Sequence, residues 1–178
     1  MMSIALSFAL SIVATSTMPA RGEIGANYFP GLRQSQVWVN VEPQSLEPGP
    51  NPFELNVTVA FPGRALAQAP VSVDLRAEAY CLLYPLRVRQ PQFSLTIDGA
   101  VLDLATPSVP FQLSPSCGHD IGSNDVVVAP LPFEVLQQMA AATVVEVRAL
   151  GFAARLTPAD LRALRAYVAA VADGVTVR

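Results

Sequence analysis

The sequence predicts a mainly β domain, either all-β or α+β, in which about seven strands form an antiparallel, sandwich-like structure. The first observation is the alternation of apolar and polar residues over Phe53–Phe61 and Val71–Cys81, a pattern typical of strands with one buried and one solvated face. The second is that 16 of the 178 residues are proline, well above the usual ~5%. Because proline interrupts helices and central strands, this favours many short elements joined by turns. The third is that strong helical patterns occur only near the C-terminal end.

The composition limits the classes of partner. Hydrophobic residues make up 52% of the chain and charged residues 14%, against roughly 25% charged in typical soluble domains. The formal net charge is −3, whereas nucleic-acid binding needs a basic face that displaces counterions. We therefore expect no nucleic-acid partner. The sequence contains no phosphate loop, dinucleotide fingerprint or HExxH motif, and we expect no cofactor.

Residues 1–20 are interpreted as a signal peptide or an N-terminal anchor. No charged side chain precedes Arg21, and the apolar stretch Ile4–Val13 has the length of a signal-peptide core. That stretch is shorter than the ~20 residues that span a bilayer. We expect cleavage and export to a bacterial periplasm or the extracellular space. An uncleaved segment would be the chain's only contact with a membrane, and a third alternative is an N-terminal strand or buried helix of the domain.

The remaining chain is expected to form an entry segment, 21–36, followed by one sandwich-like domain over 37–178. Alternation predicts a strand over Val37–Glu42 in addition to the two named above. The stretch "VWVNVEPQSLEPGPNPFELNVTV" resembles the first two strands and turn of bacterial immunoglobulin-like or fibronectin-like sandwich domains. This resemblance supports a sandwich, and it carries no functional residues.

Later strands are marked by turn residues. Asp98-Gly99 lies between two alternating runs and predicts a hairpin over Phe93–Leu104. A second hairpin is expected around Gly151, an edge strand over 105–113 and a buried strand over Asp125–Pro130.

Two helices are predicted, a short one near 132–142 and a C-terminal one near 158–172. Thr157 can cap the second helix, and Pro158 suits its first turn. Its expected apolar stripe contains Leu161, Leu164, Val168 and Val171, while Arg162 and Arg165 project elsewhere. We expect both helices to pack on an open end or face of the sheets.

The segment "SPSCGHDIGSND" contains the chain's one histidine and one of its two cysteines. Cys117, His119 and Asp120 are the residue types of a nucleophile, a base and an orienting group. No motif of a cysteine hydrolase surrounds them, however, and zinc usually requires four Cys or His ligands, whereas the chain has three such residues in total. The favoured interpretation is a disulfide between Cys81 and Cys117, with His119 a solvated bystander, no metal and no catalytic residue.

Polar and aromatic side chains elsewhere have two interpretations. Four charged residues lie on predicted solvent faces of strands: Glu54, Asp74, Arg76 and Glu78. They would form cross-strand pairs or a binding surface, and pairs are favoured. Three aromatic residues have two interpretations: Trp38, Tyr80 and Tyr84. They would line a ligand groove, or they would belong to the core or an interface, and a place in the core or an interface is favoured. Arg87 and Arg89 would hold an anion or protect a sheet edge, and edge protection is favoured.

These observations predict an exported, non-enzymatic binding or structural module that acts through a sheet face or loops on an unknown protein or small ligand. The alternatives are a small enzyme that uses Cys117 and His119, and a membrane-anchored accessory subunit.

Overall fold

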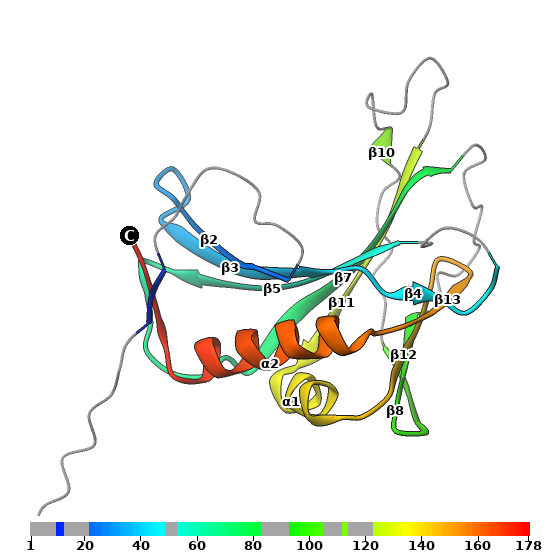
Figure 1. The fold of residues 1–178 in the computed structure, drawn as a ribbon. Coiled ribbons are helices and arrows are strands. Elements are labelled where there is room, and N and C mark those ends of the chain that lie inside the picture. Colours follow the sequence, from blue (N-terminus) through cyan, green and yellow to red (C-terminus); the bar gives the residue numbers. More distant parts are fainter. Residues whose placement is uncertain (1–9, 13–21, 49–52, 83–92, 105–111, 114–122) are drawn as a thin grey trace, which may run out of the picture.

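The computed structural model describes residues 10–12, 22–48, 53–82, 93–104, 112–113 and 123–178 (Figure 1). The described chain is mainly β with two helices, α1 (Phe133–Ala141) and α2 (Pro158–Ala172). The largest sheet contains, in order across it, β10 (Gln112–Leu113), β11 (Ser123–Pro132), β7 (Ser72–Leu82), β5 (Glu54–Pro62), β3 (Gln34–Val41) and β2 (Ile24–Phe29). All of its neighbouring strands are antiparallel.

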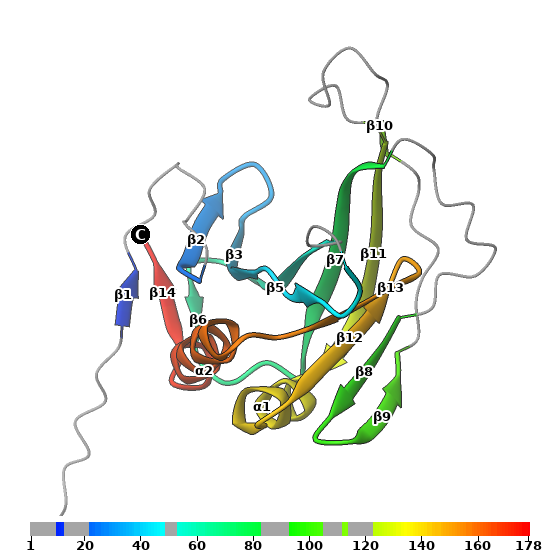
Figure 2. The same cartoon turned by 45° about the vertical axis from the view of Figure 1, so that its right-hand side comes forward.

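Two further sheets complete the strand arrangement. The five-stranded sheet contains β4 (Gln44–Ser45), β13 (Phe152–Arg155), β12 (Val145–Ala149), β8 (Phe93–Ile97) and β9 (Ala100–Asp103), all antiparallel. The small sheet contains β1 (Leu10–Ile12), β14 (Val175–Val177) and β6 (Ala65–Leu66), in which β1 is parallel to β14. Figure 2 shows the two larger sheets in one view, with both helices in the lower part of the picture.

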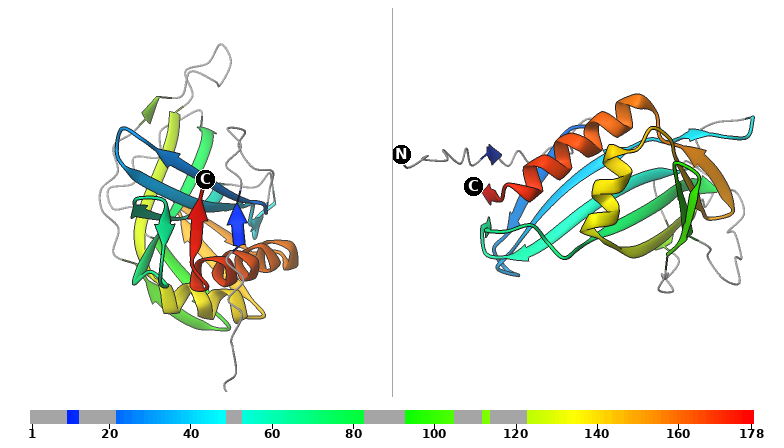
Figure 3. Two further views of the ribbon diagram at one scale, coloured as in Figure 1. Left: turned by 90° about the vertical axis from the view of Figure 1, so that its left-hand side faces the viewer. Right: turned by 90° about the horizontal axis from the view of Figure 1, so that it is seen from below.

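One hydrophobic core joins the two larger sheets and both helices. Strand alternation supplies its residues, because every second side chain of a strand points to the same face. Helix α2 packs on the inner side of the six-stranded sheet, where the hydroxyl of Tyr167 donates to the carbonyl oxygen of Val37 at 3.1 Å. Helix α1 packs against α2 and β11, and Figure 3 shows the helices together on one side of the large sheet. The other side of that sheet is therefore its outward face.

The main strands and both helices agree with the sequence predictions. Along β5 the apolar positions Leu55, Val57 and Val59 are buried and the residues between them are not. The prediction for Val71 was wrong. Alternation placed Val71 on the buried face of the strand, but it precedes β7 and is 92% exposed. Its carbonyl accepts a hydrogen bond from the amide of Phe133, the first residue of α1, so the chain turns there before the strand begins.

Both predicted hairpins form. Asp98 and Gly99 have φ angles of 46° and 91°, and Leu150 and Gly151 have 55° and 83°, as two-residue turns with positive φ require. The carboxylate of Asp98 also accepts hydrogen bonds from the amide of Val144 at 2.8 Å and the amide of Thr143 at 3.1 Å. This turn therefore ties the β8–β9 hairpin to the segment that follows α1.

Helix α2 begins with a complete capping box. The Thr157 hydroxyl accepts from the amide of Asp160, whose carboxylate accepts from the amide of Thr157 at 2.8 Å. Leu161 and Leu164 are buried as predicted, as is Val171, and Val168 is partly buried. The stripe also includes Tyr167, which the sequence analysis did not place in the core.

The domain has more strands than the about seven predicted, because several short ones occur at sheet edges. Strand β2 forms within the expected entry segment 21–36 and pairs with β3 along its whole length. Within the expected leader, Leu10–Ile12 form β1 beside β14, and the rest of residues 1–20 lies outside the described residues. In the described part of the chain, neither helix is long and apolar enough to cross a membrane.

Candidate functional site

The outward face of the six-stranded sheet carries polar side chains in aligned rows. The strand register places Trp38, Thr58 and Asp74 in one row across β3, β5 and β7. The next row contains Asn40, Asn56 and Arg76, and a third pairs Glu54 with Glu78. Each of these residues alternates with buried apolar neighbours. The face is polar, therefore, because the same alternation that builds the core points every other side chain away from it.

These rows enclose a groove with a volume of about 500 Å³. This volume falls within the roughly 300–1,000 Å³ that is common for small-molecule sites. The lining residues come from β2, β3, β5, β7 and β11: Phe29, Gln36, Trp38, Asn40, Glu54, Asn56, Thr58, Asp74, Arg76, Glu78 and Val128. Because all of them lie on strands, the groove is supported from beneath by the hydrophobic core.

The indole of Trp38 lies flat on the sheet over Gly25, its direct partner on β2. A Cβ atom at Gly25 would overlap the fusion carbon Cε2 and lie only 2.6 Å from Cζ2 and 2.8 Å from Nε1. The fusion carbon Cε2 is nearest, and its bonded neighbours Cζ2 and Nε1 are slightly farther, which is the pattern of a ring lying over the glycine. One face of the indole therefore contacts backbone, and the half-buried side chain turns its other face to the groove.

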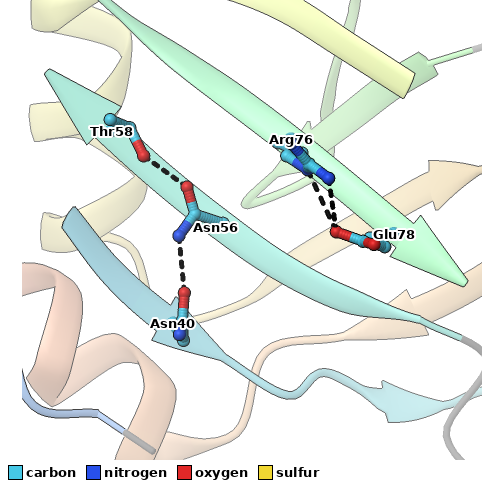
Figure 4. A network of polar contacts seen from close by, with 5 residues as sticks. All are labelled: Asn40, Asn56, Thr58, Arg76 and Glu78. Atoms are coloured by element: carbon cyan, nitrogen blue, oxygen red, sulfur yellow. Dashed lines mark hydrogen bonds and ion pairs between the residues drawn. The ribbon is translucent and has the colours of Figure 1, made fainter. Parts of the chain in front are cut away.

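Beside Trp38, three polar side chains form a hydrogen-bonded chain across β3 and β5 (Figure 4). The hydroxyl of Thr58 donates to Oδ1 of Asn56, and Nδ2 of Asn56 donates to Oδ1 of Asn40 at 2.5 Å. These bonds restrain the two amides and leave each with further donor or acceptor capacity, since an amide oxygen has two lone pairs and an amide nitrogen two hydrogens. The amides are therefore positioned to bind hydroxyl groups.

The charged side chains of the groove lie on β5 and β7, and not on β3, the strand of Trp38. Arg76 donates to Oε2 of Glu78 from both Nε, at 3.1 Å, and Nη2, at 2.7 Å (Figure 4). With Glu54 and Asp74, the groove has three carboxylates and one guanidinium, a formal charge of −2. Its electrostatic potential therefore opposes a phosphate or another anionic group.

The predicted surface residues Glu54, Asp74, Arg76 and Glu78 all line this groove. One ion pair joins Arg76 and Glu78 within β7, two residues apart. The cross-strand pairing favoured from the sequence stays a prediction. Trp38 also lines the groove. Tyr84, Arg87 and Arg89 lie outside the described residues, as does the side chain of Tyr80.

The candidate residues Cys117, His119 and Asp120 lie outside the described part of the chain, as does the side chain of Cys81. The predicted disulfide therefore stays a prediction. Among the described side chains, no group of three or more His, Cys, Asp or Glu residues is placed to hold a metal ion.

Sequence reasoning missed the neutral members of the groove, Gln36, Asn40, Asn56 and Thr58. Their alternation with apolar residues was visible and assigned them to a solvent face. Their assembly with Trp38 depends on which strands are neighbours, and no local signal marked Gly25 as the residue beneath the indole.

No family model, curated protein or solved structure matches this chain.

Proposed function

We propose that the protein is an exported, non-enzymatic binding module whose ligand lies in the groove on the outward face of the six-stranded sheet. The observation that supports this most is that the half-buried Trp38 lines the groove beside hydrogen-bonding side chains from three adjacent strands. An aromatic surface with a few fixed polar groups is typical of small-molecule sites.

The support beneath the groove favours binding without a large rearrangement. The backbone of β3, β5 and β7 is held by pairing on both sides of each strand, and the inward residues Val39, Leu55 and Leu75 are fully buried. A site on strands that are paired on both sides and packed on a core loses little conformational entropy when a ligand binds.

Trp38 provides a direct test, because it is the only tryptophan in the chain. Immobilised glycans and short peptides would be screened for binding, and each ligand found would be titrated while the Trp38 emission is recorded. We expect a ligand that changes this emission and whose binding is weakened in the Asn56→Ala and Arg76→Ala variants. The matched control is Val101→Ala, at a 69% exposed residue on β9 in the other large sheet.

Binding that is equal in the groove variants and the control would contradict the assignment of the site, as would ligands that leave the Trp38 emission unchanged. Circular dichroism and thermal melts of each variant would separate a loss of binding from a loss of folding.

Export is tested separately from binding. The uncharged N-terminal run predicts that the mature chain begins between about Arg21 and Asn27. The groove requires a start no later than Ile24, because β2 carries Gly25 beneath Trp38. N-terminal sequencing of protein from its native host measures this directly. Recovery of Met1 in a soluble cytoplasmic pool would contradict export.

A further inference from the structure

We infer that the ligand of this groove is a neutral oligosaccharide. The inference rests on the proposed binding function and specifies the chemical class of the ligand. It follows from what surrounds Trp38, from where the charges lie and from the extent of the groove.

The immediate neighbours of the indole are neutral. Gln36 and Asn40 lie two residues away on the same strand, and Thr58 lies directly opposite on β5. Amide and hydroxyl groups both donate and accept hydrogen bonds, as the hydroxyls of a sugar do. The C–H groups on one face of a sugar ring are apolar and slightly positive, and they complement the negative face of an indole.

The charged groups lie farther from the indole. Asp74 is in the same row as Trp38 but two strands away, which is about 10 Å at the usual spacing between strands. The nearest charged member of the next row, Arg76, already binds Glu78 through two nitrogens. Among the residues that line the groove, none in register with Trp38 on an adjacent strand and none two residues away on β3 is a carboxylate. The net negative charge of the groove opposes an anion.

The groove extends beyond one sugar ring. Phe29 lines its far end, four residues along β2 from Gly25, or about 13 Å at the usual rise of a strand. Gln36, which lines the groove between them, is paired with Asn27 of β2. The arrangement therefore provides one ring-stacking position at Trp38 and further contacts toward Phe29.

The experiment is isothermal titration calorimetry of the full chain with hexasaccharides of matched length. Cellohexaose, maltohexaose and chitohexaose are the neutral probes, the deacetylated glucosamine hexamer is the cationic probe, and hexagalacturonate is the anionic probe. We expect at least one neutral probe to bind, more tightly than its monosaccharide and with little dependence on salt. Neither charged probe should bind more tightly than it.

Variants of the indole position then test the stacking. Trp38→Ala should weaken binding of the neutral probe by more than about tenfold, as loss of a central aromatic anchor does, and Trp38→Phe should retain part of the affinity. Gly25→Ala should also weaken binding, because the added methyl displaces the indole without removing it. Val101→Ala should bind as the wild type does.

The outcomes distinguish the two proposals. Salt-sensitive binding of the cationic or anionic probe in the groove, without binding of a neutral probe, would overturn the oligosaccharide inference and leave the proposed binding function intact. Absence of binding by all neutral probes would overturn the inference as well. The proposed binding function itself is contradicted only by a further result, namely that the glycan and peptide screen also finds no ligand whose binding depends on Asn56 and Arg76.

Discussion

Arg165 of α2 donates from Nε to the carbonyl oxygen of Ala140 near the end of α1, at 2.7 Å. A second bond, from Nη2 to the carbonyl oxygen of Ala142, measures 3.4 Å. The last carbonyls of a helix have no partner within it, and a cation there also interacts favourably with the helix dipole. Helix α2 therefore supplies a charged hydrogen-bond donor to the carbonyl groups at the C-terminal end of α1. The sequence pattern alone predicts Arg165 as a solvent-facing residue.

Replacing Arg165 with alanine should lower the free energy of unfolding by about 1–2 kcal/mol, because a charged donor to the α1 carbonyls is lost. Arg162→Ala is the matched control on the same helix and should change it by less than about 0.5 kcal/mol. Urea unfolding of both variants provides the comparison. Equal effects would show that the α1 contact contributes nothing specific.

Leu164→Ala should lower the free energy of unfolding by about 2–4 kcal/mol, since Leu164 is fully buried at the centre of the α2 stripe and truncation leaves a cavity. Val168→Ala, at a partly buried position of the same stripe, should have a smaller effect. Chemical denaturation measures both changes. A larger loss for Val168→Ala would mean that α2 presents a different face to the core.

Tyr167 should remain protonated in the folded protein at alkaline pH. Burial raises the pKa of its hydroxyl far above the usual value of 10.0, because the charged phenolate would be desolvated. With the folded pKa above the unfolded one, this residue's contribution to stability is complete below about pH 10 and is lost as the pH rises further.

Spectroscopic titration of phenolate absorbance tests this, and one of the four tyrosines should ionise only as the protein unfolds. In Tyr167→Phe that delayed component should disappear, with a cost of about 0.5–1.5 kcal/mol at neutral pH from the lost bond to Val37. Ionisation of all four tyrosines in the folded protein near pH 10 would contradict the burial of Tyr167.

Cys81 and Cys117 should form a disulfide if the protein is exported as proposed. The bridge would close a loop of about 37 residues, for which the chain-entropy model gives roughly 3–4 kcal/mol at most. Intact mass with and without reductant, followed by peptide mapping, measures the pairing. Two alkylatable thiols in protein purified from the periplasm would contradict it and would make Cys117 and His119 candidates for reactive chemistry.

Four of the five strands that form the groove, β3, β5, β7 and β11, were predictable because their signal is local. Alternation over Phe53–Phe61 needs only the residues themselves to define a buried and a solvent-facing side, and Asp98-Gly99 defines its turn in the same way. The caps and apolar stripe of α2 are local as well, and its predicted bounds agree with the structure. Strand β2 was not predicted, because its polar, glycine-containing sequence alternates only weakly. It forms a strand by pairing with β3.

The sequence by itself therefore determined that the domain is mainly β, where its main strands and helices lie and which strand positions face solvent. Only the tertiary structure decided that Trp38 covers Gly25, that Asn40 adjoins Asn56, and that Arg76 continues their row. Backbone periodicity is set by neighbours along the chain, whereas register and strand order come from pairing between distant segments, where hydrogen bonds and burial across the whole sheet select one arrangement. The groove is a property of that arrangement, because its residues come from five strands that are brought together only by folding.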